Sequence, residues 1–525
     1  MKRFARLLDQ LSYQSQRNAK LRLVADYFSS APDPDRGYAL AALTGDLVFR
    51  HAKAGLFRDL AASRTDPMLF GLSYDYVGDL AETVALIWPQ RPNDSPPPDL
   101  ATIVETLEVS PKAKLPEITA DWLDRLDATG RWALIKFITG GLRIGLSARL
   151  AKTAVASLGK LDPDEVEEVW HALEIPYRGL FEWLEGKGPK PEARGRATFR
   201  PPMLAQPLEE EELAKLNPAD FIAEWKWDGA RVQIVGEGPL VRLYSRSGDE
   251  MTATFPEVVD HAASDVTLDG ELLVMRDGVV AGFADLQKRL NRKSLGPKLL
   301  QDYPVGVRLY DILFEGDEDL RPLPFAERRR RLESWYAAKP RPGFDLSPLV
   351  SFKDWEELAE KRATISTLGI EGLMLKRADS PYLAGRPVGQ WYKWKINPKL
   401  VDAVMMYAQR GHGKRSSFYS DYTFGLWHGE ELVPVGKAYF GFTDAELLEL
   451  DRWARNHTVN RFGPVREVER GLVLEVAFEG LQRSTRHKSG LAMRFPRINR
   501  IRWDKPAREA DELATLERML ERLGG

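Results

Sequence analysis

The stretch "EWKWDGARVQIV" runs from Glu224 to Val235 and places one lysine, Lys226, between two tryptophans. The valines and isoleucine near its end indicate a β-strand, and successive side chains of a strand point to opposite faces. If a strand already runs from Ile222, one face carries charges and the other carries the tryptophans. The charged face then holds Glu224, Lys226 and Asp228. A solvated surface strand has the same pattern, so a second stretch must decide between a surface and a site.

The stretch "WYKWK" at 391–395 repeats this arrangement. Lys393 and Lys395 share one face, and Tyr392 and Trp394 share the other. If both strands line one site, crowded cations and scarce water lower the pKa of a lysine there and leave part of it as free amine. A free amine in line with a phosphorus atom is a nucleophile, and spare lysines neutralise the phosphate oxygens. Two unrelated amphipathic strands remain the alternative.

Two acidic motifs fit the same site. In "LDGEL", Glu271 follows an expected Asp-Gly turn, and in "EGLMLK", Glu371 starts a strand beside a glycine. Phosphoryl transfer from a nucleotide usually needs a divalent cation, and carboxylate oxygens suit magnesium. An Asp-Gly-Glu sequence is also common in plain hairpin turns, which is the alternative interpretation.

Composition and charge limit the function classes. The 525 residues exceed one hydrophobic core, and the absence of cysteine excludes disulfides and thiolate metal sites. No apolar run approaches the roughly 18 residues that span a membrane, so we expect a cytoplasmic protein, nucleoid-associated if bacterial. The net charge of −2 argues against nucleic-acid binding, but the segment 481–506 holds eight basic residues and one acidic residue. Such a segregated basic surface can bind phosphates.

The predicted secondary-structure pattern changes twice along the chain. Helical periodicity continues to about Leu184, and the linker "LEGKGPKPEARGRATFRPP" follows at 184–202. Short strands alternate with helices as far as Asn397, which predicts an α+β domain. Further short strands then suit a small barrel, and the oligonucleotide-binding barrel is the commonest that binds nucleic acid. The predicted domains are 1–190, 200–397 and 398–525.

An ordered series of motifs between about Phe199 and Pro506 resembles the covalent nucleotidyltransferases, and ATP-dependent DNA ligases most closely. The series is "KWDGAR", "SRSGDEMT", "LDGEL", "LYDIL", "EGLMLK", "WYKWK" and "RFPRINRIRWDKP". The stretches "SYDYVGDLAETVALIWP" and "TGGLRIGLSARLAKTAVA" resemble the helical DNA-binding domain of bacterial enzymes of this kind. The resemblance implies a multidomain fold with an all-α N-terminal domain, an α+β nucleotidyltransferase (ATP-grasp-like ligase) core and a C-terminal β-barrel of the OB-fold type.

The resemblance also implies roles at matching positions. Lys226 would be the adenylated nucleophile, Glu224 would read the adenine amino group, and Tyr310 would stack on the ring. Glu271 and Glu371 would serve ribose or the metal. Further ATP or AMP contacts would come from Arg231, Arg246, Lys376, Lys393, Lys395, Arg494, Arg502, Asp504 and Lys505. By strict alternation, Lys376 lies on the other side of its strand from Glu371. The implied cofactors are ATP and Mg²⁺, with Mn²⁺ as an alternative.

Three basic residues are predicted to contact DNA. Lys414 and Arg415 lie in "GHGKRSS" (411–417), which mimics a phosphate loop but has Ala408 and Arg415 where that loop needs glycine and Ser or Thr. We therefore expect a basic barrel loop on DNA. Arg143 in "GGLRIG" lies between glycines that let the backbone approach a minor groove, with a plain helix-connecting turn as the alternative.

The sequence therefore predicts an ATP-dependent DNA ligase that seals 3′-hydroxyl/5′-phosphate nicks in duplex DNA through a lysyl-AMP and a DNA-adenylate. Its expected partner is nicked double-stranded DNA, bound by a monomer, and no motif specifies a repair or clamp-type protein partner. RNA ligases and mRNA capping guanylyltransferases share the lysine motif but leave the helical N-terminal region unexplained. The missing cysteines disfavour an NAD-dependent ligase. A DNA-binding scaffold with a decayed catalytic set would have lost motif positions, and none is lost here.

Overall fold

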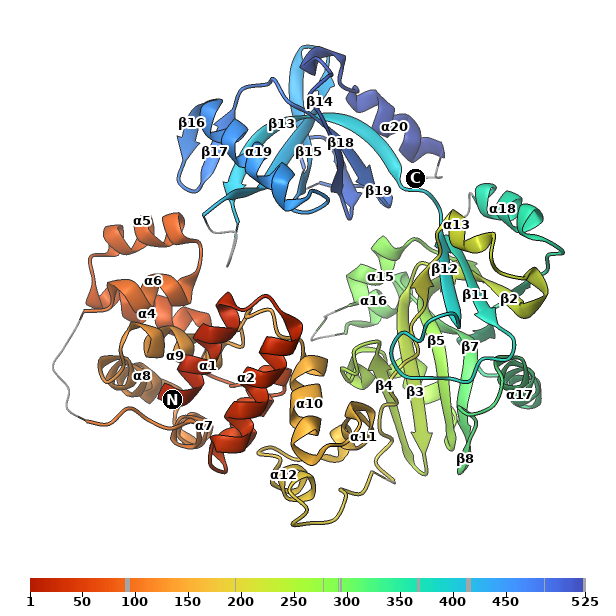
Figure 1. Cartoon of the computed structure of the whole chain (residues 1–525), viewed down its shortest axis with the longest axis horizontal. Coiled ribbons are helices and arrows are strands. Elements are labelled where there is room, and N and C mark those ends of the chain that lie inside the picture. Colours follow the sequence, from red (N-terminus) through yellow and green to blue (C-terminus); the bar gives the residue numbers. More distant parts are fainter. Residues whose placement is uncertain are drawn as a thin grey trace. The chain divides into compact units, whose positions relative to one another are not determined.

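The computed structural model describes residues 1–525 except 90–94, 194, 277, 291, 293–294, 366–368, 412–416, 486 and 523–525. The chain divides into two compact units, and Figure 1 labels their helices and strands. One contains Met1–Val166 and Lys399–Arg518, and the other is formed mainly by Glu192–Pro398. Among the described residues, no helix has the length and apolar character required to cross a bilayer.

The N-terminal part is helical, as the sequence predicts. In α1 (Lys2–Tyr13), the buried residues Phe4, Leu7, Leu8 and Leu11 are spaced three or four apart, so one helix face packs against α2 and α9. The other helices here are α2 (Arg17–Ser30), α3 (Asp35–Thr44), α4 (Ala54–Arg64), α5 (Pro67–Val77), α6 (Leu80–Ile87), α7 (Leu100–Val109), α8 (Leu115–Asp124), α9 (Ala128–Thr139), α10 (Ala148–Ala156), α11 (Pro163–Val169) and α12 (Arg178–Leu184).

The unit around Glu192–Pro398 contains two sheets. The first has the strand order β1-β12-β11-β2-β10, from β1 (Gln206–Pro207), β2 (Phe221–Trp227), β10 (Leu349–Val350), β11 (Ile370–Arg377) and β12 (Trp391–Lys395). The second has the order β4-β3-β5-β7-β8, from β3 (Ala230–Glu237), β4 (Leu240–Ser245), β5 (Val266–Arg276), β7 (Val305–Glu315) and β8 (Glu318–Asp319). Two further strands pair with β5 and β7, namely β6 (Val279–Val280) and β9 (Phe344–Leu346). The helices are α13 (Glu210–Leu213), α14 (Pro256–His261), α15 (Phe283–Arg289), α16 (Pro297–Asp302), α17 (Phe325–Ala338) and α18 (Trp355–Ala363).

The opening stretch of the sequence joins these two sheets. Strand β2 ends at Trp227 in the first sheet, and β3 begins at Ala230 in the second, so Asp228 and Gly229 carry the chain from one sheet to the other. A Cβ atom on Gly229 would lie 2.5 Å from the Leu272 carbonyl oxygen of β5. Glycine is therefore required where the chain passes this close to the neighbouring strand.

The residues from Lys399 onward are rich in strands. Strand β13 (Lys399–Arg410) pairs with β14 (Tyr419–His428) along one edge and with both β17 (Val465–Val468) and β18 (Val473–Phe478) along the other. A long strand that changes partners in this way bends the sheet. The remaining elements are β15 (Glu431–Ala438), α19 (Asp444–Asn456), β16 (Thr458–Phe462), β19 (Gly480–Arg483), β20 (Leu491–Arg494), β21 (Arg497–Arg502) and α20 (Leu513–Arg522).

An irregularity in β11 decides where its acidic residue points. The register with β2 shifts between Ile370 and Gly372, so Glu371 does not follow strict alternation. Gly372 has φ +147°, and a Cβ there would lie 2.4 Å from the Trp394 carbonyl oxygen of β12. The backbone at this bulge therefore admits only glycine.

We expect Gly372→Ala to destabilise the protein by about 2–4 kcal/mol, because it adds a backbone clash to an unfavourable φ. Gly389→Ala is the matched control, since Gly389 also has a positive φ (+78°) but nothing lies within 4 Å of its would-be Cβ. Urea denaturation of both variants measures the difference. Equal destabilisation of the two would contradict a packing role for residue 372.

Candidate active site

Lys226 and Lys395 lie on either side of Gly372 in the first sheet. Strand pairing places Gly372 opposite Lys226 of β2 and opposite Lys395 of β12. Because Gly372 has no side chain, the space between the two lysines is open to the neighbouring Glu371. Its Oε1 accepts a hydrogen bond from Lys226 Nζ, and its Oε2 lies 3.2 Å from Lys395 Nζ. One half-buried carboxylate therefore bridges both ammonium groups.

This bridge corrects the prediction that Glu371 and Lys376 point to opposite sides of their strand. Glu371 contacts Lys226, and Lys376 contacts Glu224, yet Lys226 and Glu224 lie two residues apart on β2 and share a face. The bulge before Gly372 turns Glu371 onto that face. Burial alone would raise the pKa of Glu371, but the charges of Lys226 and Lys395 lower it below its ordinary value. The sequence placed Glu371 at this site for ribose or the metal, but not its ion pairs with Lys226 and Lys395.

Lys393 lies in the next row of the sheet. It pairs through Met374 with Glu224 and lies on the same face of β12 as Lys395, as the alternation predicts. Burial lowers the pKa of Lys393, and the nearby cations Arg386, Lys395, Lys226 and Arg246 lower it further. The predicted residue Arg246 therefore belongs to this basic cluster, and Arg386 is a member that the motifs did not reveal. Such a cluster attracts an anionic ligand.

Glu271 lies within strand β5 and not after a turn, so the expected Asp-Gly turn is wrong. Its register partners are Arg231 on β3 and Arg308 on β7. Burial raises the pKa of Glu271 to about 8, despite the opposing charges of Lys226 and Arg231. Among the described residues, none forms a hydrogen bond with the Glu271 carboxyl group. A carboxyl group such as that of Glu271, near Lys226 and without a hydrogen-bond partner among these residues, is suited to bind a ligand.

Arg231 is more constrained than its predicted role as an ATP or AMP contact suggests. Its guanidinium donates to both oxygens of Asp269, to the Tyr382 hydroxyl at 3.0 Å and to the Met203 carbonyl at 2.6 Å. Tyr310 of β7 lies beside it, with its ring centroid 5.8 Å from the Arg231 Cζ. Most of its five donors are thus used within the protein. Asp269 and Tyr382 were missed, although Asp269 stands in the quoted motif "LDGEL".

Glu224 is almost fully buried and is held by two cations, Arg329 of α17 at 2.9 Å and Lys376 of β11 at 2.7 Å. Arg329 was also missed. Its signal was present in the sequence, because Phe325, Arg329 and Leu332 have the spacing of one helix face and all three are buried. An arginine at a core-facing position indicates a buried anionic partner.

The last motif lies in the strand-rich part of the other unit. Arg502 donates to Asp504 at 3.0 Å and to Asp402 of β13 at 3.2 Å, and Lys505 donates to the same Asp402 oxygen at 2.8 Å. Arg494, at the end of β20, lies with its guanidinium 5.3 Å from the Phe495 ring. Asp402 is thus an unpredicted residue that gathers two of the predicted cations.

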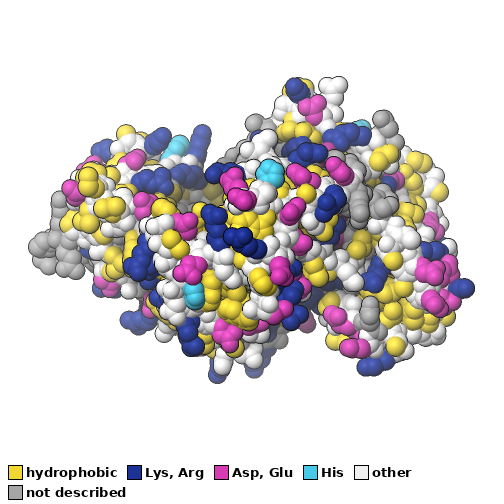
Figure 2. Space-filling view, turned by 90° about the horizontal axis from the view of Figure 1, so that it is seen from above, with side chains coloured by type: hydrophobic (Ala, Val, Ile, Leu, Met, Phe, Trp, Pro, Cys, Tyr) yellow, Lys and Arg dark blue, Asp and Glu magenta, His cyan; other side chains and the backbone are white. Residues whose placement is uncertain are grey.

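The predicted DNA contacts are placed as follows. Arg143 is exposed in the connection between α9 and α10 and has a φ of +45°, while Lys20 donates to the carbonyls of Ile144 and Gly145 and fixes this loop. Lys414 and Arg415 lie outside the described residues. On the face shown in Figure 2, lysine and arginine side chains lie interspersed with acidic ones. Positive charge on this face is therefore distributed among several small groups.

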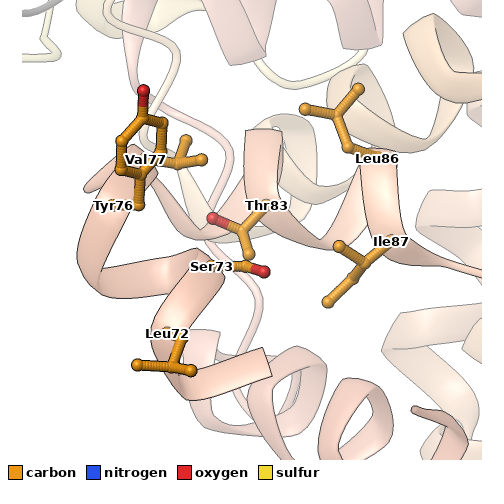
Figure 3. A pocket seen from close by; sticks show the side chains of 7 residues that line it. All are labelled: Leu72, Ser73, Tyr76, Val77, Thr83, Leu86 and Ile87. Atoms are coloured by element: carbon orange, nitrogen blue, oxygen red, sulfur yellow. The ribbon is translucent and has the colours of Figure 1, made fainter. Parts of the chain in front are cut away.

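The helical part also contains an apolar pocket between α5 and α6 (Figure 3). Its lining consists of Leu72, Ser73, Tyr76, Val77, Thr83, Leu86 and Ile87. None of these side chains is a lysine, arginine or carboxylate, so the pocket does not offer the groups that phosphoryl transfer requires. The lysine-bearing sheet face is therefore the candidate active site.

The two-sheet core with lysines on one sheet face defines a nucleotidyltransferase-type enzyme, and the comparisons with known proteins narrow this class. A family profile described as "ATP dependent DNA ligase domain" matches residues 202–395, and one described as "ATP dependent DNA ligase C terminal region" matches residues 415–505. The chain is 32% identical to a "Probable DNA ligase" of Koribacter versatilis over 562 residues, which cover 98% of this chain and 96% of the relative. The protein belongs to the ATP-dependent DNA ligase family.

Two further similarities agree with this assignment. The chain is 34% identical to "DNA ligase 1" of Korarchaeum cryptofilum over 418 residues, which cover 76% of this chain and 72% of that protein. A solved structure titled "Pmar-Lig_PreS3" has a TM-score of 0.59 at 17% identity and covers 95% of this chain and 99% of its own. The latter shows a likeness of fold, with a helical N-terminal region, a nucleotidyltransferase-type core and a strand-rich C-terminal part.

The raised pKa of Glu271 predicts a pH-dependent stability. The folded protein keeps this proton up to about pH 8, whereas the unfolded carboxyl releases it near its ordinary value of 4.5. Because the unfolded state binds fewer protons in this window, stability falls as the pH rises from about 4.5 to about 8. Glu271→Gln removes that loss, so its advantage over the wild type should grow by about 1 kcal/mol or more between pH 5 and pH 8.

Urea unfolding at both pH values, without nucleotide or metal, measures this advantage. The exposed Glu211 supplies the control, because Glu211→Gln should shift stability equally at both pH values. A Glu271→Gln advantage that stays constant with pH would show that this carboxyl group is ionised in the folded protein.

Proposed function

We propose that the protein seals nicks in duplex DNA through a lysyl-AMP formed on Lys226. The observation that supports this most directly is the bridge from Glu371 to Lys226 and Lys395, with Lys393 in the adjacent row. One lysine is held as a potential nucleophile while two others remain to neutralise phosphate. Family membership supports the reaction class, and this geometry supports the choice of Lys226 as the residue that carries AMP.

The reaction proceeds in three in-line displacements at phosphorus. The Lys226 amine attacks the α-phosphorus of ATP, forms a P–N bond and releases pyrophosphate. Its proton passes to the Glu371 carboxylate, which already accepts a hydrogen bond from it. The DNA 5′-phosphate then attacks the lysyl-AMP, which breaks the P–N bond and gives a DNA-adenylate. Finally the 3′-hydroxyl attacks the 5′-phosphorus and AMP departs. Lys393 and Lys395 stabilise the charge on the phosphate oxygens.

Glu271 and Glu371 fit a magnesium ion. Among the described residues no group of three or more His, Cys, Asp or Glu side chains forms a metal site. Magnesium needs no such cage, because it keeps several waters and binds through one or two carboxylates together with substrate phosphates. When bound, Mg²⁺ or Mn²⁺ would neutralise charge on the triphosphate.

The other parts of the chain bind DNA and carry the last motif. We propose the divisions 1–190, 200–397 and 398–525 as a DNA-binding domain, an adenylation domain and an OB-type barrel. Arg143 and the loop with Lys414 and Arg415 contact the duplex. Arg494, Arg502, Asp504 and Lys505 orient pyrophosphate during the first step, and the barrel moves aside before DNA enters. Arg231, Arg246, Tyr310 and Lys376 complete the nucleotide site.

Incubation with α-labelled ATP and magnesium should label the protein, whereas Lys226→Ala should remove the label completely because no other amine occupies its position. Mass spectrometry of the labelled peptide should place the AMP on residue 226. GTP or NAD should not label the wild type, and preferential labelling by GTP would indicate a capping enzyme. A nicked DNA duplex compared with a nicked RNA duplex tests the substrate.

The last motif, which contains Arg502 and Lys505, should affect only the formation of the lysyl-adenylate. Arg502→Ala and Lys505→Ala should each slow lysyl-adenylate formation by about tenfold or more, because each removes a charge-assisted contact to pyrophosphate. Both variants should seal a nick supplied as ready-made DNA-adenylate at nearly the wild-type rate. Arg461→Ala, an exposed arginine of β16, serves as control for adenylation. An equal loss in both steps would contradict the assignment.

A further inference from the structure

The Glu224 carboxylate lies in a buried ionic cluster that also contains Arg329 and Lys376. Arg329 Nη1 donates to its Oε1 at 2.9 Å. Lys376 Nζ lies 2.7 Å from its Oε2, as an ion pair without the angles of a regular hydrogen bond. The side chains of Glu224 and Lys376 are each 2% exposed and that of Arg329 is 6% exposed. Burying three charged groups together is costly unless each is paired, so this arrangement calls for an explanation.

Both cations are fixed from outside the cluster. Arg329 also donates to the Ser347 carbonyl at 2.8 Å and to Glu333, one turn further along α17, at 2.7 Å. Lys376 is enclosed by aromatic rings, with centroids 4.5–4.7 Å from its Nζ, which belong to Tyr310, Phe325 and Trp391. Neither side chain can move away without losing several contacts. The Glu224 carboxylate is therefore held in one orientation, with each oxygen paired to one cation.

An ionised carboxylate has only acceptors, and this determines which purine it tolerates. The amino group of adenine offers two N–H donors to such a group. Hypoxanthine and guanine carry a carbonyl oxygen at the same position, and two acceptors facing each other repel. The two cations that pair with Glu224 hold its oxygens in place as acceptors.

We propose that Arg329 and Lys376 are positioning residues that set the selectivity for ATP, by holding the Glu224 carboxylate in the orientation in which it accepts from the 6-amino group of the base. This rests on the proposed function, in which Glu224 reads adenine. It gives Lys376 a different role from a phosphate contact, because its ammonium lies in the aromatic enclosure against Glu224. A solely structural cluster would join α17 to the sheet and would be indifferent to the base.

Three nucleotides distinguish a positioning role of Arg329 and Lys376 from a solely structural role. Formation of the labelled lysyl-adenylate is measured with ATP, with inosine triphosphate, and with purine riboside triphosphate, which has neither an amino group nor an oxygen at position 6. In Arg329→Met, the KM for ATP should rise about tenfold or more while kcat changes little, which corresponds to one charge-assisted hydrogen bond. The KM for purine riboside triphosphate should change less than about threefold, because this base never used the contact. The preference for ATP over inosine triphosphate should fall by about tenfold.

Matched variants complete the test. Arg330 lies next to Arg329 on α17 but faces outward with a 65% exposed side chain, so Arg330→Met should leave all three KM values unchanged. Lys376→Met places an apolar side chain in the aromatic enclosure and should reproduce the Arg329→Met pattern if the latter variant fails to fold. Glu224→Gln should abolish the ATP preference, and adding Arg329→Met to it should cost little more, since the two act through one contact.

The outcomes distinguish this inference from the function on which it rests. A wild-type protein that takes no label from ATP, or takes it away from Lys226, would overturn the proposed function itself. A wild type that labels normally, with variants that weaken all three nucleotides equally, would overturn only the role of Arg329 and Lys376. Additive losses in the Glu224→Gln, Arg329→Met double variant would do the same.

Discussion

The contact on which the active site depends is the bridge of Glu371 between two lysines across a glycine. Lys226 and Lys395 stand two strands apart in the first sheet, so their backbones are separated by roughly 9.6 Å. Two ammonium groups on one sheet face repel unless an anion lies between them. Gly372 leaves the intervening position empty, and the bulge before it turns the neighbouring carboxylate into the gap. The lysines are thereby held side by side before any phosphate arrives.

The cross-strand partners of β2, β11 and β12 form further rows on the same sheet face. The row Lys226–Gly372–Lys395 is followed by Glu224–Met374–Lys393 and then by Ile222–Lys376–Trp391. Charges thus change along β2 from a cation to an anion within two residues. In the proposed function this alternation separates a phosphate-binding end from a base-binding end, because phosphates need cations and an adenine amino group needs an acceptor. The spacing of a single strand sets the distance between the two ends.

Much of this could be predicted from the sequence, because strands have a simple period. The alternating charges and aromatics of "EWKW" and "WYKWK" predicted that Lys393 and Lys395 share one face and that Tyr392 and Trp394, which the structure buries, share the other. The prediction for Glu371 was wrong because a β-bulge breaks the period, and no local residue pattern marks a bulge apart from the glycine. The predicted turn at Glu271 was wrong because an Asp-Gly pair within a strand looks the same as one in a hairpin. The helix-face spacing indicates that Arg329 is buried, but its partner Glu224 lies 105 residues away in the chain, and Asp402 lies 100 residues from Arg502. Only the folded structure reveals these pairings.

The proposed selectivity of this site depends on buried charge, which comes at a cost in stability. Glu271 is held as an acid by burial, while Glu371 and Glu224 are each held beside two cations. Three carboxyl groups within one small region would repel one another if all were ionised without partners. In the proposed function these different surroundings give them different roles: Glu271 takes up a ligand, Glu371 accepts a proton and Glu224 contacts the base. A core packed only with apolar side chains would be easier to fold, but it could not separate these tasks.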